Sequence, residues 1–488
     1  MPRLPLAIVF AALPLAAAIT DPVRVEQGQL LGIPGSDPDV RVYKGVPFAA
    51  PPVGDLRWRA PKPAADWSGV RKADQFSATC MQVPYPGGSL YYSAPQPVSE
   101  DCLYLNIWTA AKAPSDKRPV MVWIHGGAFT RGSGSTPVYD GENLAKKGVV
   151  VVTVNYRLGI FGFFAHPELT QESEHRSSGD YGILDEIAAL QWVQKNIAAF
   201  GGDPRSVTIF GESAGSWAVN VLVASPLTKG LFQRAIGESG ANFNKMTNLA
   251  DLEKTGARAG SIQELRAKSA EDVMKTAGAF SVNVDGWLLP TDVMTIFEKG
   301  RQNDVPILIG SNADEGTAFM PAKITVVAMQ ATARQRFGAK ADQLAQIYPA
   351  ATDDEAWKAS AALMRDTTFG LQMRTWARMQ AKTGQAPAYL YYFNHVPPGA
   401  EHYGAYHASE ISYVFGTGHN WQDADRKLSG LMSSYWVNFA TTGNPNGKDL
   451  PVWPNYDENK DVALGLGDEV HPIPVPNKAG LDFLAGLR

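Results

Sequence analysis

Apolar and polar positions along the chain follow two regular patterns, one typical of buried strands and one typical of helices. Near-continuous apolar and β-branched runs occupy residues 102–108, 118–127 and 148–159. Strands have this composition when both faces of a parallel sheet are covered. Residues 181–200 instead carry apolar side chains at helical spacing. Strand, helix and strand in this order predict an α/β fold with a mainly parallel sheet and helical crossovers.

The second half of the chain continues the alternation. Residues 207–210 predict a further strand, followed by a helix that begins near Ser216. Two later apolar runs predict strands within residues 304–316 and 388–396. Helical stretches around them form long insertions, which we expect to pack over one end of the sheet. No repeat, low-complexity block or linker separates a second unit, so residues 19–488 are predicted to form one domain.

Composition and net charge limit the classes of partner that this protein is expected to bind. The 488 residues are 45% hydrophobic and 19% charged, as in folded globular proteins. The formal net charge is -4, and no Lys/Arg cluster is longer than two residues. These features argue against nucleic acid or acidic lipid as the main partner, and a neutral substrate fits better.

Residues 1–18 have the pattern of a signal peptide. Arg3 precedes an apolar run that ends in small residues, with Ala18 as the expected cleavage site. A membrane anchor is the alternative, but the run is interrupted by Pro5 and Pro14 and is short of the about 20 residues that a span needs. We therefore expect a secreted or periplasmic protein without a stable membrane span.

The chain has two cysteines, Cys80 and Cys102. An even count in a chain that is predicted to be exported favours a disulfide, with two separate buried thiols as the alternative. The bridge would close a loop of about 22 residues and stabilise the fold by roughly 3 kcal/mol in the loop-entropy model. No Cys/His spacing for zinc and no calcium loop is present, so the sequence predicts neither a metal nor another cofactor.

The pentapeptide Gly211-Glu212-Ser213-Ala214-Gly215 joins the strand at 207–210 to the following helix. G-x-S-x-G alone occurs by chance, and a plain glycine turn is the alternative. Between a strand and a helix, however, this motif forms a tight elbow that exposes the serine at the carboxyl end of the sheet. Small residues two positions away on each side let the strand and helix approach. Ser213 is therefore a candidate nucleophile.

A serine hydroxyl needs a base, usually a histidine that is oriented by a carboxylate. In one common triad order the acid follows the serine, and the histidine follows the acid. This order leaves five candidates for the base: His395, His402, His407, His419 and His471. Order alone does not choose among them.

An oxyanion on the substrate would also need hydrogen-bond donors. The sequence "WIHGGAF" at 123–129 ends a predicted strand, and its Gly-Gly-Ala run leaves backbone N–H groups accessible. The amide of Ala214 supplies a further donor. A glycine turn without a ligand is the alternative.

Together these motifs resemble the type-B carboxylesterases and lipases, an α/β-hydrolase family that includes cholinesterases and bacterial para-nitrobenzyl-type esterases. The resemblance implies an α/β-hydrolase fold, in which a large, mostly parallel sheet has flanking helices and helical insertions over the active-site end. It runs nearly from end to end through these segments: "KGVPFAAPPVGDLRW", "EDCLYLNIW", "WIHGGAF", "VNYRLGIFGF", "GDYGILDEIAALQWVQKNIAAFGGDPRSVTIFGESAG", "GSNADEGTAF", "GAYHASEISYVFG" and "NFATTGNPN".

The resemblance assigns roles to single residues. Ser213 matches the nucleophile of the family, and Glu315 matches the acid, with Asp314 as its adjacent rival. His407 matches the general base, with His402 as the next choice.

Gly127, Ala128 and Ala214 match the amides of the oxyanion hole. Many relatives have a third glycine at the position of Ala128, but a methyl group there leaves the N–H intact. The resemblance also places Glu212 and Ser239 in a buried layer behind the triad. It joins Cys80 to Cys102 as well.

The resemblance implies a serine carboxylesterase that hydrolyses a small-molecule ester with water through an acyl-enzyme. Amide, carbamate, thioester, lactone and lipid-ester hydrolysis are alternatives, and so is a non-catalytic binding protein. In cholinesterases, a Trp in the loop ahead of the segment that matches "EDCLYLNIW" helps to hold a quaternary ammonium. The corresponding loop of this chain, residues 81–99, contains no Trp. Tyr91 and Tyr92 in that loop either line the site or only pack. The insertions at 245–300 and 318–400 are expected to line the acyl and alcohol pockets. The sequence does not indicate an oligomeric state.

Overall fold

The computed structural model describes residues 19–487, and the predicted signal peptide at 1–18 lies outside them. An eleven-stranded sheet forms its centre, in the order β16-β15-β14-β13-β12-β11-β9-β10-β8-β4-β3. The strands are β3 (Ile33–Pro34), β4 (Arg41–Pro47), β8 (Tyr104–Thr109), β9 (Arg118–Ile124), β10 (Val150–Val154), β11 (Gly202–Glu212), β12 (Arg234–Glu238), β13 (Ile307–Asn312), β14 (Ala388–Phe393), β15 (Val462–Leu466) and β16 (Val470–Pro474). From β10 to β15 all neighbours are parallel. Antiparallel pairs flank them at both edges. The mainly parallel sheet is confirmed.

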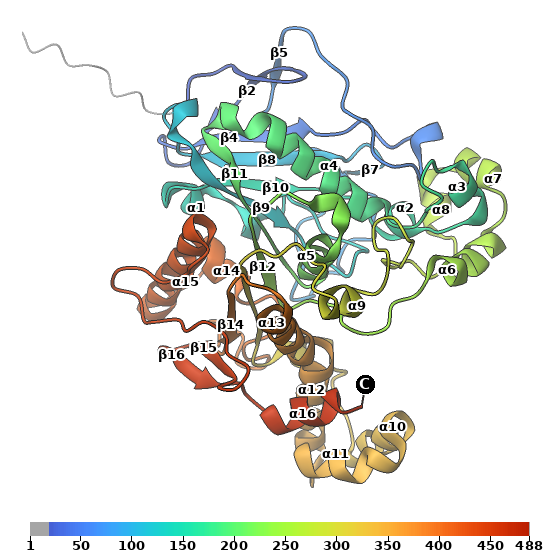
Figure 1. Ribbon diagram of the computed structural model, residues 1–488, viewed down its shortest axis with the longest axis vertical. Helices are drawn as coiled ribbons and strands as arrows, with labels where there is room; N and C mark the ends of the chain where they lie inside the picture. Colours follow the sequence, from blue (N-terminus) through green and yellow to red (C-terminus); the bar gives the residue numbers. More distant parts are fainter. Residues whose placement is uncertain (1–18, 488) are drawn as a thin grey trace, which may run out of the picture.

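Helices cover both faces of this sheet (Figure 1). Side chains alternate between the faces of a strand. In β9, Val120, Val122 and Ile124 therefore enter one core, while Met121 and Trp123 enter the other. The first core is closed by α4 (Tyr181–Asn196), α5 (Ala214–Ala224), α9 (Val293–Glu298) and α13 (Leu371–Thr383). The second is closed by α1 (Glu142–Lys146), α14 (Ile411–Phe415) and α15 (Asp423–Thr442).

Several element boundaries differ from the sequence predictions. β11 begins at Gly202, five residues before the predicted start at residue 207. Its first part carries polar, partly exposed residues, which the apolar pattern does not detect. α5 begins at Ala214 rather than near Ser216, immediately after the elbow. The α-helix predicted to end at residue 200 ends at Asn196 and continues as a 3-10 turn.

The two insertions lie apart from one another in Figure 1. The first contains α6 (Leu249–Gly256), α7 (Ile262–Ala267) and α8 (Ala270–Met274). The second contains α10 (Val326–Phe337), α11 (Ala341–Ile347) and α12 (Asp353–Arg365). α12 packs against the 3-10 turn Glu315–Phe319, which directly follows β13. The remaining elements are β1 (Val23–Val25), β2 (Gly28–Leu31), β5 (Val70–Lys72), β6 (Thr79–Cys80), β7 (Val98–Ser99), α2 (Gly159–Phe163), α3 (Pro167–Glu172) and α16 (Lys478–Ala485). Within residues 19–487, no helix is long and apolar enough to cross a membrane.

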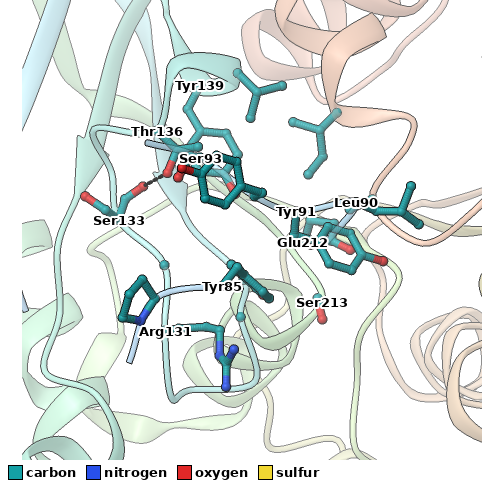
Figure 2. Close-up of a pocket in the computed structure, with 18 of the residues that line it drawn as sticks. Tyr85, Leu90, Tyr91, Ser93, Arg131, Ser133, Thr136, Tyr139, Glu212 and Ser213 are labelled. Atoms are coloured by element: carbon teal, nitrogen blue, oxygen red, sulfur yellow. Dashed lines mark hydrogen bonds between the residues drawn. The ribbon is translucent and has the colours of Figure 1, made fainter. Parts of the chain in front are cut away.

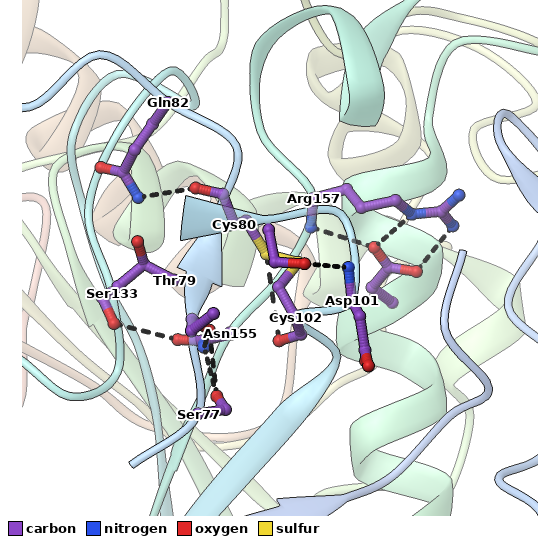
Figure 3. The surroundings of a disulfide bond; sticks show 12 residues. Ser77, Thr79, Cys80, Gln82, Asp101, Cys102, Ser133, Asn155 and Arg157 are labelled. Carbon is purple, nitrogen blue, oxygen red and sulfur yellow. Dashed lines mark hydrogen bonds and ion pairs between the residues drawn. A yellow bond between two sulfur atoms is a disulfide. The ribbon is translucent and has the colours of Figure 1, made fainter. Parts of the chain in front are cut away.

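Cys80 and Cys102 form a disulfide, which confirms the predicted pairing (Figure 3). Both cysteines are buried, and the bridge closes the loop at 81–101. The side-chain amide of Gln82 ties this loop to a neighbouring turn: it donates to the carbonyl oxygen of Gly132 and accepts from the N–H of Gly132, both at 2.8 Å. These contacts hold the loop beside the carboxyl ends of β9 and β11.

Candidate active site

Ser213 lies at a tight elbow between β11 and α5. Its backbone has φ 56° and ψ -121°, a conformation that L-residues rarely adopt and that costs of order 1–3 kcal/mol. The N–H of Ser213 donates to the carbonyl oxygen of Glu238 at 2.8 Å, which helps to hold the turn. A Cβ at Gly215 would lie 2.0 Å from the carbonyl oxygen of Ile124, and one at Gly211 would lie 2.6 Å from the same atom. Both flanking glycines are therefore required for the strand and helix to approach.

His407 and Glu315 meet in the interior. The His407 Nδ1 atom lies 2.6 Å from Glu315 Oε2, and Glu315 is fully buried. The other oxygen of Glu315 accepts the N–H of Asn312 at 2.8 Å. Asp314 accepts the N–H of Ala405 instead, at 2.9 Å. The structure thus brings Glu315, rather than its neighbour, to the histidine.

The other four candidate histidines lie elsewhere. His395 is hydrogen-bonded to two aspartates at 2.8 and 2.9 Å. His402, His419 and His471 are exposed. Among the five, only His407 lines the same cavity as Ser213.

Glu212 stands next to the histidine. Its Oε1 atom lies 3.0 Å from His407 Nε2. Within the described chain, no hydrogen bond joins that nitrogen to the Ser213 hydroxyl. Burial raises the pKa of the Glu212 carboxyl well above its usual range, and the nearby charges of Glu315 and Glu238 raise it further. The uncharged form of this carboxyl is therefore favoured where it contacts the histidine.

Further buried groups surround this contact. Burial raises the pKa of Glu238 to about 8, although Trp436 Nε1 donates to its carboxyl at 2.8 Å. Burial and the neighbouring carboxylates also raise the pKa of Glu410 well above its usual range. Ser239 follows Glu238 with φ 55° and is fully buried. Its hydroxyl makes no hydrogen bond within residues 19–487. Nothing in the local sequence pattern of Glu238 indicates burial, and Glu410 was expected only to solvate the start of a helix, whereas both are fully buried.

The turn after β9 presents free amides. Gly127 and Ala128 adopt φ 107° and 56°, and the carbonyl oxygen of Gly127 accepts the N–H groups of Thr130 and Arg131 at 3.0 and 3.1 Å. In the described part of the chain, the N–H groups of Gly127, Ala128 and Ala214 donate to no protein acceptor. Both segments line the cavity that contains Ser213 or directly follow that residue. This arrangement can receive an oxyanion.

A cavity of about 650 Å³ opens onto Ser213 (Figure 2). His407 also lines this cavity. Much of its wall comes from the disulfide loop at 81–101, including Tyr91 and Tyr92. The Tyr91 hydroxyl donates to the backbone oxygen of His407 at 3.1 Å, so this tyrosine also holds the histidine.

The expectation that the insertions line this cavity was largely wrong. No residue of 245–300 and only Phe319 of 318–400 lines it, whereas the disulfide loop supplies much of the described wall. Two aromatic rings pack against the His407 imidazole, that of Phe319 at 5.1 Å and that of Phe369 at 4.6 Å between centroids. No sequence pattern indicates the contact of Phe369, which lies in the helical turn Asp366–Gly370 between α12 and α13.

A mainly parallel sheet covered on both faces, with a serine at a strand-to-helix elbow, defines an α/β-hydrolase. Comparison with known proteins identifies the family. The model of the carboxylesterase family matches residues 20–479, so the chain belongs to this family and is a carboxylic ester hydrolase.

Individual relatives agree with this assignment. The chain is 39% identical to fumonisin B1 esterase of Sphingopyxis macrogoltabida, over 94% of this chain and 89% of that protein. It is 37% identical to para-nitrobenzyl esterase of Bacillus subtilis, over 92% and 95% of the two chains. A solved structure of PNB esterase superposes with a TM-score of 0.82 at 34% identity, covering 95% of this chain and 98% of the other.

Proposed function

We propose that this protein is a serine carboxylesterase in which Ser213, His407 and Glu315 form the catalytic triad. The observation that carries the proposal is the 2.6 Å contact between His407 and Glu315 at the wall of the cavity that holds Ser213. Glu315 would hold the imidazole in the tautomer that leaves Nε2 free to accept a proton. Glu212 and Ser239 would form a buried layer behind these three residues.

The reaction would proceed by acyl transfer. His407 Nε2 takes the proton of Ser213 Oγ as this oxygen attacks the ester carbonyl carbon. The amides of Gly127, Ala128 and Ala214 hold the resulting oxyanion. The imidazolium returns its proton to the departing alcohol, which leaves an acyl-enzyme. Water then attacks in the same way, releases the acid and restores the serine.

In the free enzyme, His407 Nε2 contacts Glu212 instead of the Ser213 hydroxyl. Catalytic hydrogen bonds are often loose before substrate binds and tighten in the complex. Because burial raises the pKa of Glu212 and favours its uncharged form, this carboxyl holds the imidazole less strongly than a second carboxylate would. A serine hydroxyl that turns toward Nε2 can therefore replace this contact.

The test combines mutation with covalent labelling. Ser213→Ala should lower kcat for p-nitrophenyl acetate by a factor on the order of 10⁶, as in other triads. A matched variant on α15, Ser434→Ala, should retain the activity of the wild type. An organophosphate should label Ser213, as located by mass spectrometry of peptides. Retained activity in Ser213→Ala, or an adduct on another residue, would refute the assignment.

We also propose that residues 1–18 are a signal peptide and that the mature protein is secreted or periplasmic. The apolar run that ends at Ala18 supports this, and so does a disulfide, which persists in oxidising compartments. Residues 19–488 would form one domain, because a single sheet contains strands from both halves of the chain. The substrate would be a small ester, with water as the second reactant.

A further inference from the structure

Arg131 is the one lysine or arginine that lines the catalytic cavity in the described chain. Its guanidinium lies over the ring of Tyr85, 4.8 Å from the centroid, and Figure 2 shows the two side chains together. No carboxylate within residues 19–487 forms an ion pair with it, and its side-chain nitrogens donate no hydrogen bond there. A partly buried cation is usually paired with an anion, and contact with an aromatic ring offsets the loss of hydration only in part.

The backbone fixes where this cation stands. The N–H of Arg131 donates to the carbonyl oxygen of Gly127, the residue whose own N–H faces the oxyanion position. The next residue, Gly132, makes two hydrogen bonds to Gln82 of the disulfide loop. Arg131 is therefore held from both sides, within one side-chain length of the amides that would receive the ester carbonyl.

The rest of the cavity contains little charge that would oppose an anion. Glu212 is the one Asp or Glu among its described lining residues, and burial raises the pKa of its carboxyl, which favours the uncharged form. Most other lining side chains are tyrosines, small polar groups or aliphatic groups. A substrate carboxylate beside Arg131 would thus meet a cation that no acidic side chain within residues 19–487 already pairs with. The overall charge of -4 suggested a neutral substrate, but it describes the whole surface rather than this cavity.

We propose that Arg131 makes this enzyme selective for esters that carry a second, ionised carboxylate group. A guanidinium matches a carboxylate with two parallel N–H···O bonds, which a point charge does not provide. The ester carbonyl would lie at the amides of Gly127 and Ala128, and the second carboxylate would lie on the guanidinium. This inference rests on the proposed ester hydrolysis and adds the substrate class.

The experiment compares matched charged and neutral esters. Mono-p-nitrophenyl glutarate carries the carboxylate on the acyl side, and p-nitrophenyl pentanoate is its neutral counterpart. 4-Acetoxybenzoate carries the carboxylate on the leaving group, with 4-methylphenyl acetate as its neutral counterpart. For each pair the readout is the ratio of kcat/KM for the charged ester to kcat/KM for the neutral ester, in the wild type and in variants.

Arg131→Gln should lower this ratio on the order of 10- to 100-fold for at least one pair, mainly through KM, because a charge-assisted hydrogen bond is lost. The affected pair tells on which side of the ester the carboxylate binds. Arg131→Lys keeps the charge but lacks the planar guanidinium, so its ratio should lie between the ratios of the wild type and Arg131→Gln. Arg334→Gln removes an equal charge from the exposed face of α10 and should leave both ratios unchanged.

Two outcomes separate this inference from the proposed function. If the wild type hydrolyses the neutral esters but Arg131→Gln and Arg131→Lys leave both ratios unchanged, Arg131 does not select the substrate and esterase activity stands. If the wild type hydrolyses none of the four esters, the proposed function fails and the inference fails with it. Thermal unfolding of each variant identifies a folding defect, which would affect both members of a pair and cancel in the ratio.

Discussion

At the scale of single residues, adjacent carboxylates have different partners. Glu315 contacts His407, whereas Asp314 accepts a backbone N–H of the loop that carries the histidine. Glu315→Gln should therefore lower kcat by a factor on the order of 10⁴, as amide replacement of a triad carboxylate does. Asp314→Asn retains an acceptor for the backbone N–H and should cost less than about tenfold in kcat. Steady-state kinetics of both variants tests this assignment. A larger loss of kcat in Asp314→Asn than in Glu315→Gln would make Asp314 the acid of the triad.

A second prediction concerns Glu238 and pH. Burial raises its pKa to about 8 in the folded protein, whereas the same glutamate in the unfolded chain has an ordinary pKa near 4.5. Between these two pH values, the folded protein therefore keeps a proton that the unfolded chain has lost. The contribution of this group to stability is thus present below pH about 4.5 and is lost as pH rises toward 8. Glu238→Gln keeps an acceptor for Trp436 Nε1 but cannot ionise.

The melting temperature of Glu238→Gln relative to wild type should therefore be more favourable at pH 8 than at pH 5. Calorimetry at the two pH values measures this difference. A surface replacement, Glu298→Gln at the exposed end of α9, serves as the control and should show no such trend. A difference that is equal at both pH values, or larger at pH 5, would show that Glu238 is ionised in the folded protein.

At the scale of elements, the disulfide loop at 81–101 forms much of the cavity wall, while the proposed triad lies on other segments. Removing the bridge with Cys80→Ala and Cys102→Ala should lower the free energy of unfolding by roughly 3 kcal/mol in the loop-entropy model. It should also raise KM more than it lowers kcat, because substrate contacts loosen first. Urea unfolding and ester kinetics measure both effects, and reduced wild-type protein is the matched control. A loss confined to kcat would mean that the loop acts mainly through Tyr91 and His407.

The same loop shows where sequence interpretation reaches its limit. The apolar runs of β9, β10 and β11 predict the parallel sheet because strands buried on both faces need such runs. Residues 81–101 have no periodicity, and their position depends on a long-range bridge and on the contacts of Gln82 with Gly132. Motif order likewise left five histidines as candidates for the base, and the family resemblance pointed to His407. The structure brings His407 into contact with Glu315, which lies 92 positions earlier in the sequence. That Arg131 is the one lysine or arginine among the described lining residues can be recognised only once the fold shows which residues line the cavity.

At the scale of the whole molecule, the proposed export bears on the fold at the start of the described chain. Ile19 is buried, and its N–H donates to the carbonyl oxygen of Ala111 at 3.0 Å. A mature chain that begins here would keep this contact through its terminal ammonium group. Intact mass measurement of protein that is exported from the full-length chain should show the loss of residues 1–18, within a few residues, and two hydrogen atoms fewer than the reduced chain. Residues 19–488 produced in a reducing cytoplasm should melt at a lower temperature and recover on oxidation of Cys80 and Cys102. An exported protein that retains residues 1–18 would contradict the predicted cleavage, and one that contains two free thiols would contradict the predicted oxidation.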